Sequence, residues 1–285
     1  ALVQQRSGGR IAVAVYPEGQ LYGDHDEAQA LQLGAVEMLA PSLSKFDRMG
    51  FPEFGLFDLP YLFPSVASVR RITQGRLGER LLAGLKRQRL VGLGFMDNGF
   101  KHMSANRPLL EVADFAGQRL RIQASQVLAM QMRALGARPV TLAFSETRQA
   151  LAAGVVDGTE NPISNFWTQG MHTVQTDLSL TQHGYLGYAV VVGQRFWLSM
   201  APADRTLVRD ALQEALVYGN QIADTQNDKA LAALRGFAGT RIHALTADQM
   251  ARLGRAVQGV HQKLAQRIGM QWLDGVRAAV AQQPD

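Results

Sequence analysis

The sequence predicts an α/β fold divided into two domains, and three observations lead to this prediction. The chain has 285 residues, more than a single hydrophobic core usually serves. Segments typical of strands alternate with segments typical of helices. A pattern of helix end, glycine and short strand closing on an acid occurs at 30–37 and again at 150–157. Two such halves would face each other across a cleft, because open α/β sheets bind ligands at strand carboxyl ends. The alternative is coincidence among common residues.

The first elements are predicted from local signals. Alternating β-branched residues predict a strand over 10–16. Asp24 or Asp26 can cap a short helix, which Gly34 ends in the left-handed conformation. A short strand over 35–39 follows.

The middle of the chain is predicted to continue this alternation. The sequence Asp97-Asn98-Gly99 predicts a turn after a strand, Gly136 predicts a helix end, and Ser145 predicts a helix cap. The predicted strands are 90–95, 118–123, 139–142 and 188–192, and the predicted helices are 127–135 and 146–153.

A long helix is predicted near the C-terminus. One apolar face continues from Pro202 to about Leu234, which corresponds to roughly 45–50 Å. Such a helix either flanks one sheet or braces two domains. Thr246 and Gln249 form a capping-box pattern that predicts a final helix running towards Ile268.

Composition narrows the class of protein. There is no cysteine, and no apolar stretch reaches the ~18 residues of a membrane span. The net charge is +5, but the basic runs 86–89 and 70–71 resemble solvated helix faces, so no nucleic-acid partner is expected. A modest positive field would attract anions. Residues 1–10 contain no apolar run, so no signal peptide is expected within this sequence.

The sequence lacks four motifs that are typical of catalytic or nucleotide-binding sites. G-x-S-x-G, P-loop, H-E-x-x-H and G-x-G-x-x-G patterns are absent. None of the six histidines lies three or four residues from another. We therefore expect no enzyme activity, no metal and no cofactor.

Two polar segments are candidates for a carboxylate site. In a strand over 119–123, Arg119, Arg121 and Gln123 would share one face, and a guanidinium can bind a carboxylate through two hydrogen bonds. A surface arginine at a sheet edge is the alternative. The segment 157–165 would form a polar loop whose Asn161 and Asn165 can donate and accept. An ordinary turn is the alternative.

Several longer motifs resemble one family. The chain is similar to the solute-binding proteins of TRAP transporters, in particular the DctP branch, which binds C4-dicarboxylates. The resemblance covers essentially the whole chain. Its motifs are LQLGAVEMLAPS at 31–42, FDLPYLF at 57–63, DNGFK at 97–101, MSAN at 103–106, AFSET at 143–147, ALAAGVVDGTENP at 150–162 and HGYLGY at 183–188.

The resemblance implies a two-domain periplasmic binding protein fold with discontinuous domains and a cleft between them. Domain I would comprise 1–104 plus about 187–227, and domain II 105–186 plus about 228–285. A bracing helix at about 203–235 would cross both. The implied function is periplasmic capture of a small organic acid for delivery to a membrane-embedded TRAP permease, without catalysis and without insertion of this chain into the membrane.

The resemblance also implies ligand-binding residues. Arg121 would pair with the ligand carboxylate, Asn161 would complete the clamp, Arg107 would be a second basic contact and Phe144 would wall the pocket. The weaker candidates are Lys101, Ser42, Asn165 and Tyr185. His183 is interpreted as a structural histidine.

Three departures from the family leave the ligand open. The family's first strand and part of its first helix lack counterparts here, so some binding residues are expected to lie outside this sequence. Phe95-Met96 stands where an aromatic pair is usual, and Arg107 stands where lysine is usual. The alternatives are another acid (2-oxo, sugar or aromatic) on the same scaffold, an enzyme acting on a small carboxylate, or a receptor's sensor domain.

Overall fold

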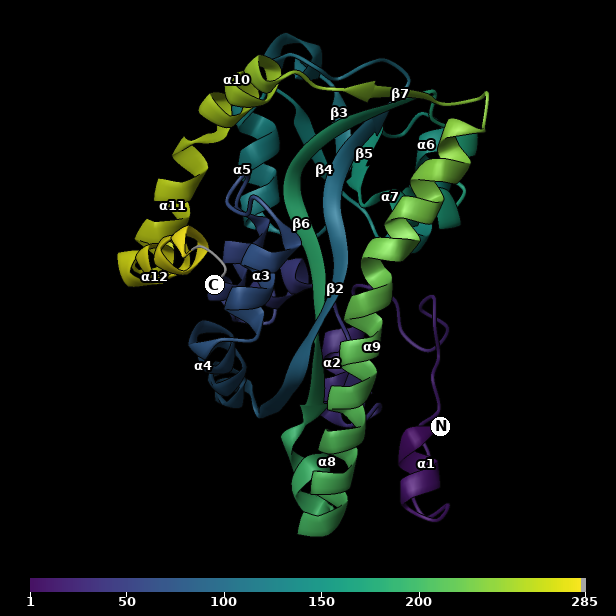
Figure 1. Ribbon diagram of the computed structural model, residues 1–285, viewed down its shortest axis with the longest axis vertical. Coiled ribbons are helices and arrows are strands. Elements are labelled where there is room, and N and C mark those ends of the chain that lie inside the picture. Colours follow the sequence, from purple (N-terminus) through teal and green to yellow (C-terminus); the bar gives the residue numbers. More distant parts are fainter. Residues whose placement is uncertain (283–285) are drawn as a thin grey trace.

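Two long antiparallel strands form the axis of the molecule. They are β2 (Leu90–Ala105) and β6 (Asp177–Gly193), and they belong to a single sheet with the strand order β1-β6-β2-β5-β3-β4, in which β7 also pairs with β6 (Figure 1). The computed structural model describes residues 1–282. The predicted α/β class is confirmed. The shorter strands are β1 (Met38–Leu39), β3 (Arg119–Ile122), β4 (Arg138–Thr141), β5 (Gly158–Asn161) and β7 (Arg241–Ala244).

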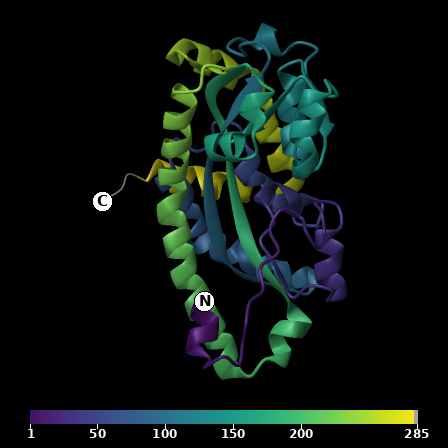
Figure 2. The same ribbon diagram turned by 90° about the vertical axis from the view of Figure 1, so that its right-hand side faces the viewer.

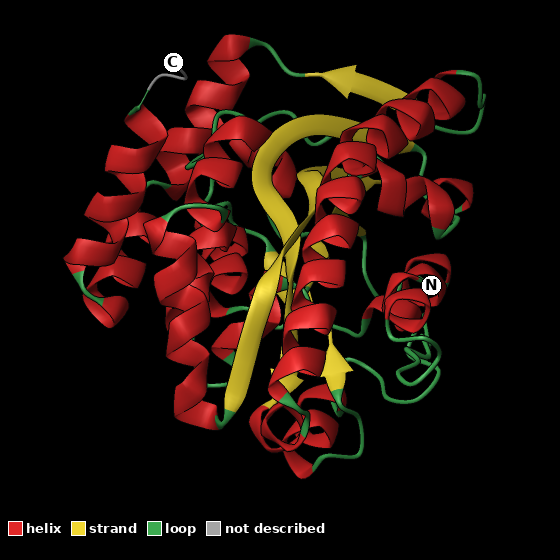
Figure 3. Ribbon diagram, turned by 60° about the horizontal axis from the view of Figure 1, so that its bottom comes forward, coloured by secondary structure: helices red, strands yellow, loops and turns green. Residues whose placement is uncertain are grey.

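Helices lie on both sides of these strands (Figure 3). Their α-helical bounds are α1 Leu2–Arg6, α2 Glu27–Leu33, α3 Val66–Thr73, α4 Arg76–Gly84, α5 Gln126–Ala134, α6 Thr147–Ala152, α7 Ile163–Thr168, α8 Gln194–Ser199, α9 Pro202–Arg235, α10 Ala247–Val257, α11 Gly259–Ile268 and α12 Met270–Ala281. The 3-10 helices are η1 Leu43–Asp47, η2 Pro52–Asp58, η3 Leu85–Gln88, η4 Val112–Phe115, η5 Phe144–Glu146 and η6 Met171–Thr173. No helix in residues 1–282 is both long and apolar enough to cross a bilayer.

The predicted long helix is confirmed as α9. Its 34 residues extend for about 50 Å and run beside β2 and β6 (Figures 1 and 2). Its first half packs Val208 and Leu216 into one apolar cluster, whereas its second half packs Ala230 and Leu234 into another. The helix therefore braces both ends of the strands.

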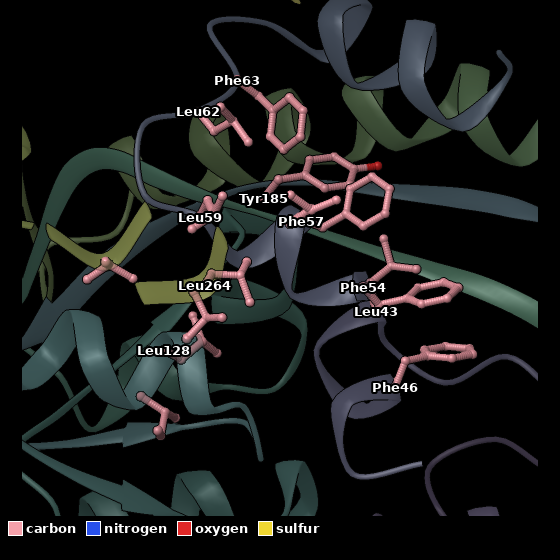
Figure 4. Close-up of a cluster of buried hydrophobic side chains, with 14 of the residues drawn as sticks. Leu43, Phe46, Phe54, Phe57, Leu59, Leu62, Phe63, Leu128, Tyr185 and Leu264 are labelled. Atoms are coloured by element: carbon pink, nitrogen blue, oxygen red, sulfur yellow. The ribbon is translucent and has the colours of Figure 1, made fainter. Parts of the chain in front are cut away.

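The largest core is built around aromatic side chains. The rings of Phe46 and Phe54 stack with centroids 4.3 Å apart, and Phe57 and Phe63 stack at 6.1 Å (Figure 4). Tyr185 on β6 meets Phe63 edge to face, and β6 also packs against η1 and η2. The same cluster extends to α5, α11 and α12, which means that it is continuous across much of the molecule.

The repeated segment has the same local geometry in both places. The amide of Gly34 donates to Leu31 O, and the amide of Gly154 donates to Leu151 O. Both glycines have a positive φ, +78° and +66°, which a residue with a side chain adopts at a cost. Each helix end is followed by a strand of the sheet, β1 at one edge or β5 between β2 and β3.

Several predictions of local structure are wrong. Residues 10–16 form no regular strand, and Val15 is 79% exposed, because this segment pairs with no other strand among the described residues. The expected turn at Asp97-Asn98-Gly99 lies inside β2, where pairing with β6 keeps the backbone extended. Ser145 caps no helix. The first turn of η5 is closed instead by the Glu146 carboxylate, which accepts a hydrogen bond from Ala143 N.

Two further predictions required correction. The segment 157–165 is not a loop, because 158–161 pairs between β2 and β3 and 163–168 is helical. The predicted final helix is divided at Gln258 into α10 and α11, and a further helix, α12, follows Gly269, whose φ is +97°. The division into two domains stays a prediction. The last helix, α12, packs against α3. The segment 228–285, which is assigned to domain II, therefore also contacts a helix assigned to domain I.

Candidate functional site

Arg121 is the central feature of the candidate site. It lies on β3, its side chain is 1% exposed, and its Nε and Nη2 both donate to Leu142 O at 3.1 and 2.9 Å. It forms no ion pair with any carboxylate of residues 1–282. Burial lowers the pKa of Arg121 to about 10, which leaves the guanidinium charged at neutral pH. A buried cation whose hydrogen bonds go only to a carbonyl oxygen can take an anion as a further partner.

Phe144 forms the wall beside this guanidinium. The Cζ of Arg121 lies 5.7 Å from the centre of the Phe144 ring, close enough for a cation–π interaction. The Phe144 amide donates to Asp24 Oδ2 at 2.9 Å, which links η5 to the segment before α2. Residues 120 positions apart therefore meet at this point.

A second basic group near the site already has partners. Lys45 Nζ lies 2.8 Å from Asp24 and 2.6 Å from Glu27. Burial tends to lower the pKa of Lys45, but the two carboxylates outweigh it and raise the pKa above its usual value. For Asp24, burial is outweighed by Lys45 and the pKa falls, whereas for Glu27 burial prevails and the pKa rises. The free electrostatic partner for an anion is therefore Arg121 rather than Lys45.

Asn161 lies on the same face of the sheet as Arg121. Thr159 of β5 pairs directly with Arg121 of β3, and side chains two residues apart in a strand point to the same side. Asn161 Nδ2 donates to Thr159 Oγ1 at 3.3 Å and contacts Met171 Sδ at 3.6 Å. The structure thus brings Arg121, Phe144 and Asn161 to one face.

Amide and phenol groups from β2, α7 and β6 form a polar group that extends the site. Asn98 Nδ2 donates to Asn165 Oδ1 at 3.1 Å and to the Tyr188 hydroxyl at 2.8 Å, while its Oδ1 accepts from Ser164 Oγ at 3.2 Å. Burial raises the pKa of Tyr188, so its hydroxyl stays protonated at neutral pH. These groups can read an oxygen-rich ligand without adding charge.

Ser42 is placed next to this polar group. It forms an isolated bridge with Tyr188, and its buried Oγ has no hydrogen-bond partner within residues 1–282. An unpaired buried hydroxyl costs free energy unless a ligand or water satisfies it. Ser42 is therefore well placed for an additional contact.

Lys101 is not brought to Arg121. Along β5, Glu160 alternates with Asn161, so its side chain points to the opposite face of the sheet. There Lys101 Nζ lies 3.1 Å from Glu160 and 3.4 Å from Asp58, and His183 Nε2 lies 3.0 Å from Glu160. All four side chains are buried, so they form an internal ionic cluster. The interpretation of His183 as a structural residue fits this position.

The two remaining candidates also lie apart from Arg121. Tyr185 is buried in the aromatic core, and its hydroxyl donates to Asp97, which also pairs with Arg70 at 2.7 Å. Burial raises the pKa of Tyr185 well above its usual value. Arg107 follows β2, has a half-exposed side chain and lies 3.4 Å from Asp114.

Sequence reasoning missed four residues at or beside the site. The sequence predicts Asp24 only as a helix cap, Asn98 as part of a turn and Tyr188 as part of a buried strand, and it assigns no role to Lys45. Each acquires its position through contacts with distant segments, which no local pattern encodes. The one available signal was the pair of acids at 24 and 27 ahead of a lone lysine.

The described residues show no arrangement suited to a metal ion, since no group of three or more His, Asp or Glu side chains within 1–282 is positioned to hold one. The chemistry that the site supports is reversible binding. Charge comes from Arg121, shape from Phe144, and directional hydrogen bonds from amides and hydroxyls.

Comparisons with known proteins find similarity over nearly the whole chain. The family model described as "Bacterial extracellular solute-binding protein, family 7" (DctP) matches residues 1–267. The C4-dicarboxylate-binding periplasmic protein DctP of Rhodobacter capsulatus is 48% identical over 282 residues, which cover 99% of this chain and 84% of that protein. Two crystal structures of TRAP periplasmic solute-binding proteins with bound succinate superpose closely. The one from Sulfurospirillum deleyianum has a TM-score of 0.94 and 38% identity, and the one from Shewanella oneidensis has 0.95 and 36%; each comparison covers 98% of this chain and 91% of the other.

Proposed function

The chain belongs to family 7 of the bacterial extracellular solute-binding proteins, and from this premise we propose that it binds a C4-dicarboxylate of the succinate, malate or fumarate class. Members of this family are receptors for solutes. The bound acid would be delivered to the membrane-embedded permease of a TRAP transporter, and capture would take place in the periplasm without chemical change of the ligand.

The observation that carries the proposal is the unpaired guanidinium of Arg121. Its two donors to Leu142 O leave Nη1 without an acceptor in the described protein. A ligand carboxylate would supply the missing partner, and Asn161 would add a hydrogen bond from the same face. Charge-assisted hydrogen bonds of this kind are about twice as strong as neutral ones.

The second carboxylate of the ligand would meet uncharged donors. Asn98, Asn165, Tyr188 and Ser42 offer amide and hydroxyl groups, and Ser42 Oγ has no partner among the described residues. Exclusion of water around the bound acid would strengthen its pairing with Arg121, because charges interact more strongly in a low-dielectric environment.

The first test replaces Arg121 by alanine. Loss of one partner of a buried charged pair costs about 2–5 kcal/mol, so succinate affinity should fall about 30-fold to several-thousand-fold. Titration calorimetry measures this change. Arg119→Ala is the matched control, because Arg119 lies on the same strand but is partly exposed and pairs with Asp157 at 2.6 Å. Equal affinities of the Arg121→Ala protein and the control would contradict the proposed role.

The second test distinguishes the ligand classes. Succinate, malate and fumarate are compared by thermal shift with 2-oxo, sugar and aromatic acids at equal concentration. A ligand at ~100 times its Kd stabilises the folded protein by about 2.7 kcal/mol, so the preferred acid gives the largest rise in Tm. A larger rise in Tm with one of the other acids would show that the protein prefers that class of acid to C4-dicarboxylates. Turnover of the bound acid, followed by mass spectrometry, would instead identify an enzyme.

A further inference from the structure

Helix α9 presents three amide side chains to β2 at a regular interval. Gln213, Asn220 and Asn227 are spaced seven residues apart, which places them on one face of the helix. Gln213 Nε2 donates to Leu93 O at 2.7 Å, Asn220 Oδ1 accepts from Asp97 N at 2.8 Å, and Asn227 Nδ2 donates to Asn98 O at 2.7 Å. We call these three residues the amide row.

The amide row meets β2 where its pairing with β6 is interrupted. The register passes from Gly92 to Gly94 and from Asp97 to Gly99, so Leu93 and Asn98 have no partner in β6. A bulged residue leaves backbone groups outside the ladder, and buried backbone groups need a partner. The amide row supplies that partner from the helix, which fixes the position of α9 along the bent strand.

Asn227 has a contact that the other two lack. Its Oδ1 accepts from the amide of Ser164 at 3.0 Å, so one side chain joins α9, β2 and α7. Ser164 lies between Asn161 and Asn165 in the sequence. Asn98, whose carbonyl Asn227 holds, contacts Asn165 through its own side chain.

We propose that Asn227 is the positioning residue of the ligand site, which it does not itself contact. By holding Asn98 O and Ser164 N together, it fixes the two segments that present the amide groups of the site. This inference rests on the proposed function, because it explains how that site is held. Gly99 is part of the same device, since a Cβ at this position would lie 2.7 Å from Asn227 Nδ2.

The test compares Asn227→Leu with Gln213→Leu. Each variant removes an amide that donates to a bulged carbonyl of β2, but only the first also releases Ser164. We expect succinate affinity to fall about tenfold in Asn227→Leu and to stay unchanged in Gln213→Leu, although both lose thermal stability. Equal affinities in the two variants would overturn the inference.

A second readout does not depend on any ligand. Hydrogen exchange of the Ser164 amide in the ligand-free protein should accelerate in Asn227→Leu and remain slow in Gln213→Leu. Failure of wild-type protein to bind any acid would reject the proposed function, whereas unchanged exchange at Ser164 would reject the role of Asn227. Gly99→Ala keeps Asn227 but displaces it, so it should show the same faster exchange. Normal exchange in that variant would count against the proposal.

Discussion

At the scale of single residues, the two fully buried cations of residues 1–282 have different partners. Lys101 meets two carboxylates inside the protein, Asp58 and Glu160, whereas Arg121 donates only to a carbonyl oxygen and lies over the Phe144 ring. Both charges pay a desolvation cost on folding. The cost of Lys101 is offset within the chain, so its role is structural. The cost of Arg121 is offset only in part, by Leu142 O and by the charges of Glu160, Asp24 and Glu146, which is why Arg121 carries the proposed binding site.

The ionic cluster makes a testable contribution to stability. Glu160→Gln removes one of the carboxylates beside Lys101 and should lower the free energy of unfolding by about 3 kcal/mol. Urea denaturation at pH 7 measures the loss. Glu111→Gln is the control, because Glu111 pairs with Arg252 at the surface and its loss should matter little. A Glu160→Gln protein as stable as that control would show that the cluster adds nothing.

The same carboxylate predicts a pH dependence. Burial alone would raise the pKa of Glu160, but Lys101 and His183 outweigh burial and lower it to about 2, from 4.5. A carboxylate whose pKa is lowered in the folded state stabilises that state at pH values above its ordinary pKa. This stabilisation is lost as the pH falls and the carboxylate binds a proton. The stability difference between wild type and Glu160→Gln should therefore shrink as pH falls from 4.5 towards 2. Denaturation curves across this range would contradict the assignment if the difference stayed constant.

At the scale of elements, the start of α10 shows a capping box formed as predicted. Thr246 Oγ1 accepts from Gln249 N at 3.2 Å, and Gln249 Oε1 accepts from Thr246 N at 2.9 Å. Thr246→Ala removes one half of the box and should cost about 1 kcal/mol, whereas Thr246→Ser keeps the hydroxyl and should cost less. Thermal unfolding of the two variants measures these losses of stability. Equal stability of both would mean that the cap contributes nothing to the fold.

At the scale of the whole molecule, the long strands connect all the apolar clusters. Leu178, Tyr185 and Val192 of β6 each belong to a different cluster. The two proposed domains should therefore unfold together in one transition rather than separately. Far-ultraviolet circular dichroism should coincide with tryptophan fluorescence, because Trp167, Trp197 and Trp272 lie in or against different clusters. Two separated transitions would show that the domains are energetically independent.

The sequence by itself determined the elements whose signals are local. The apolar face of α9, the capping box at Thr246 and the glycine stops at Gly34 and Gly154 were predicted because each depends on neighbours within a few residues. Arg121 was also identified, through its place in an apolar strand and through the family resemblance. Its chemistry as a carboxylate partner follows from the side chain alone.

The tertiary structure alone decided the features that depend on distant partners. Asp97-Asn98-Gly99 has the composition of a turn, yet pairing with β6 keeps it in a strand and converts Asn98 into a bulge. Residues 10–16 have the pattern of a strand, but no described strand pairs with them. Lys101 and Arg121 look alike in sequence, and only the face of the sheet assigns one to the ionic cluster and leaves the other for a ligand. Long-range contacts decide which strands pair and which face of the sheet a side chain occupies. This is why neither could be deduced from local pattern.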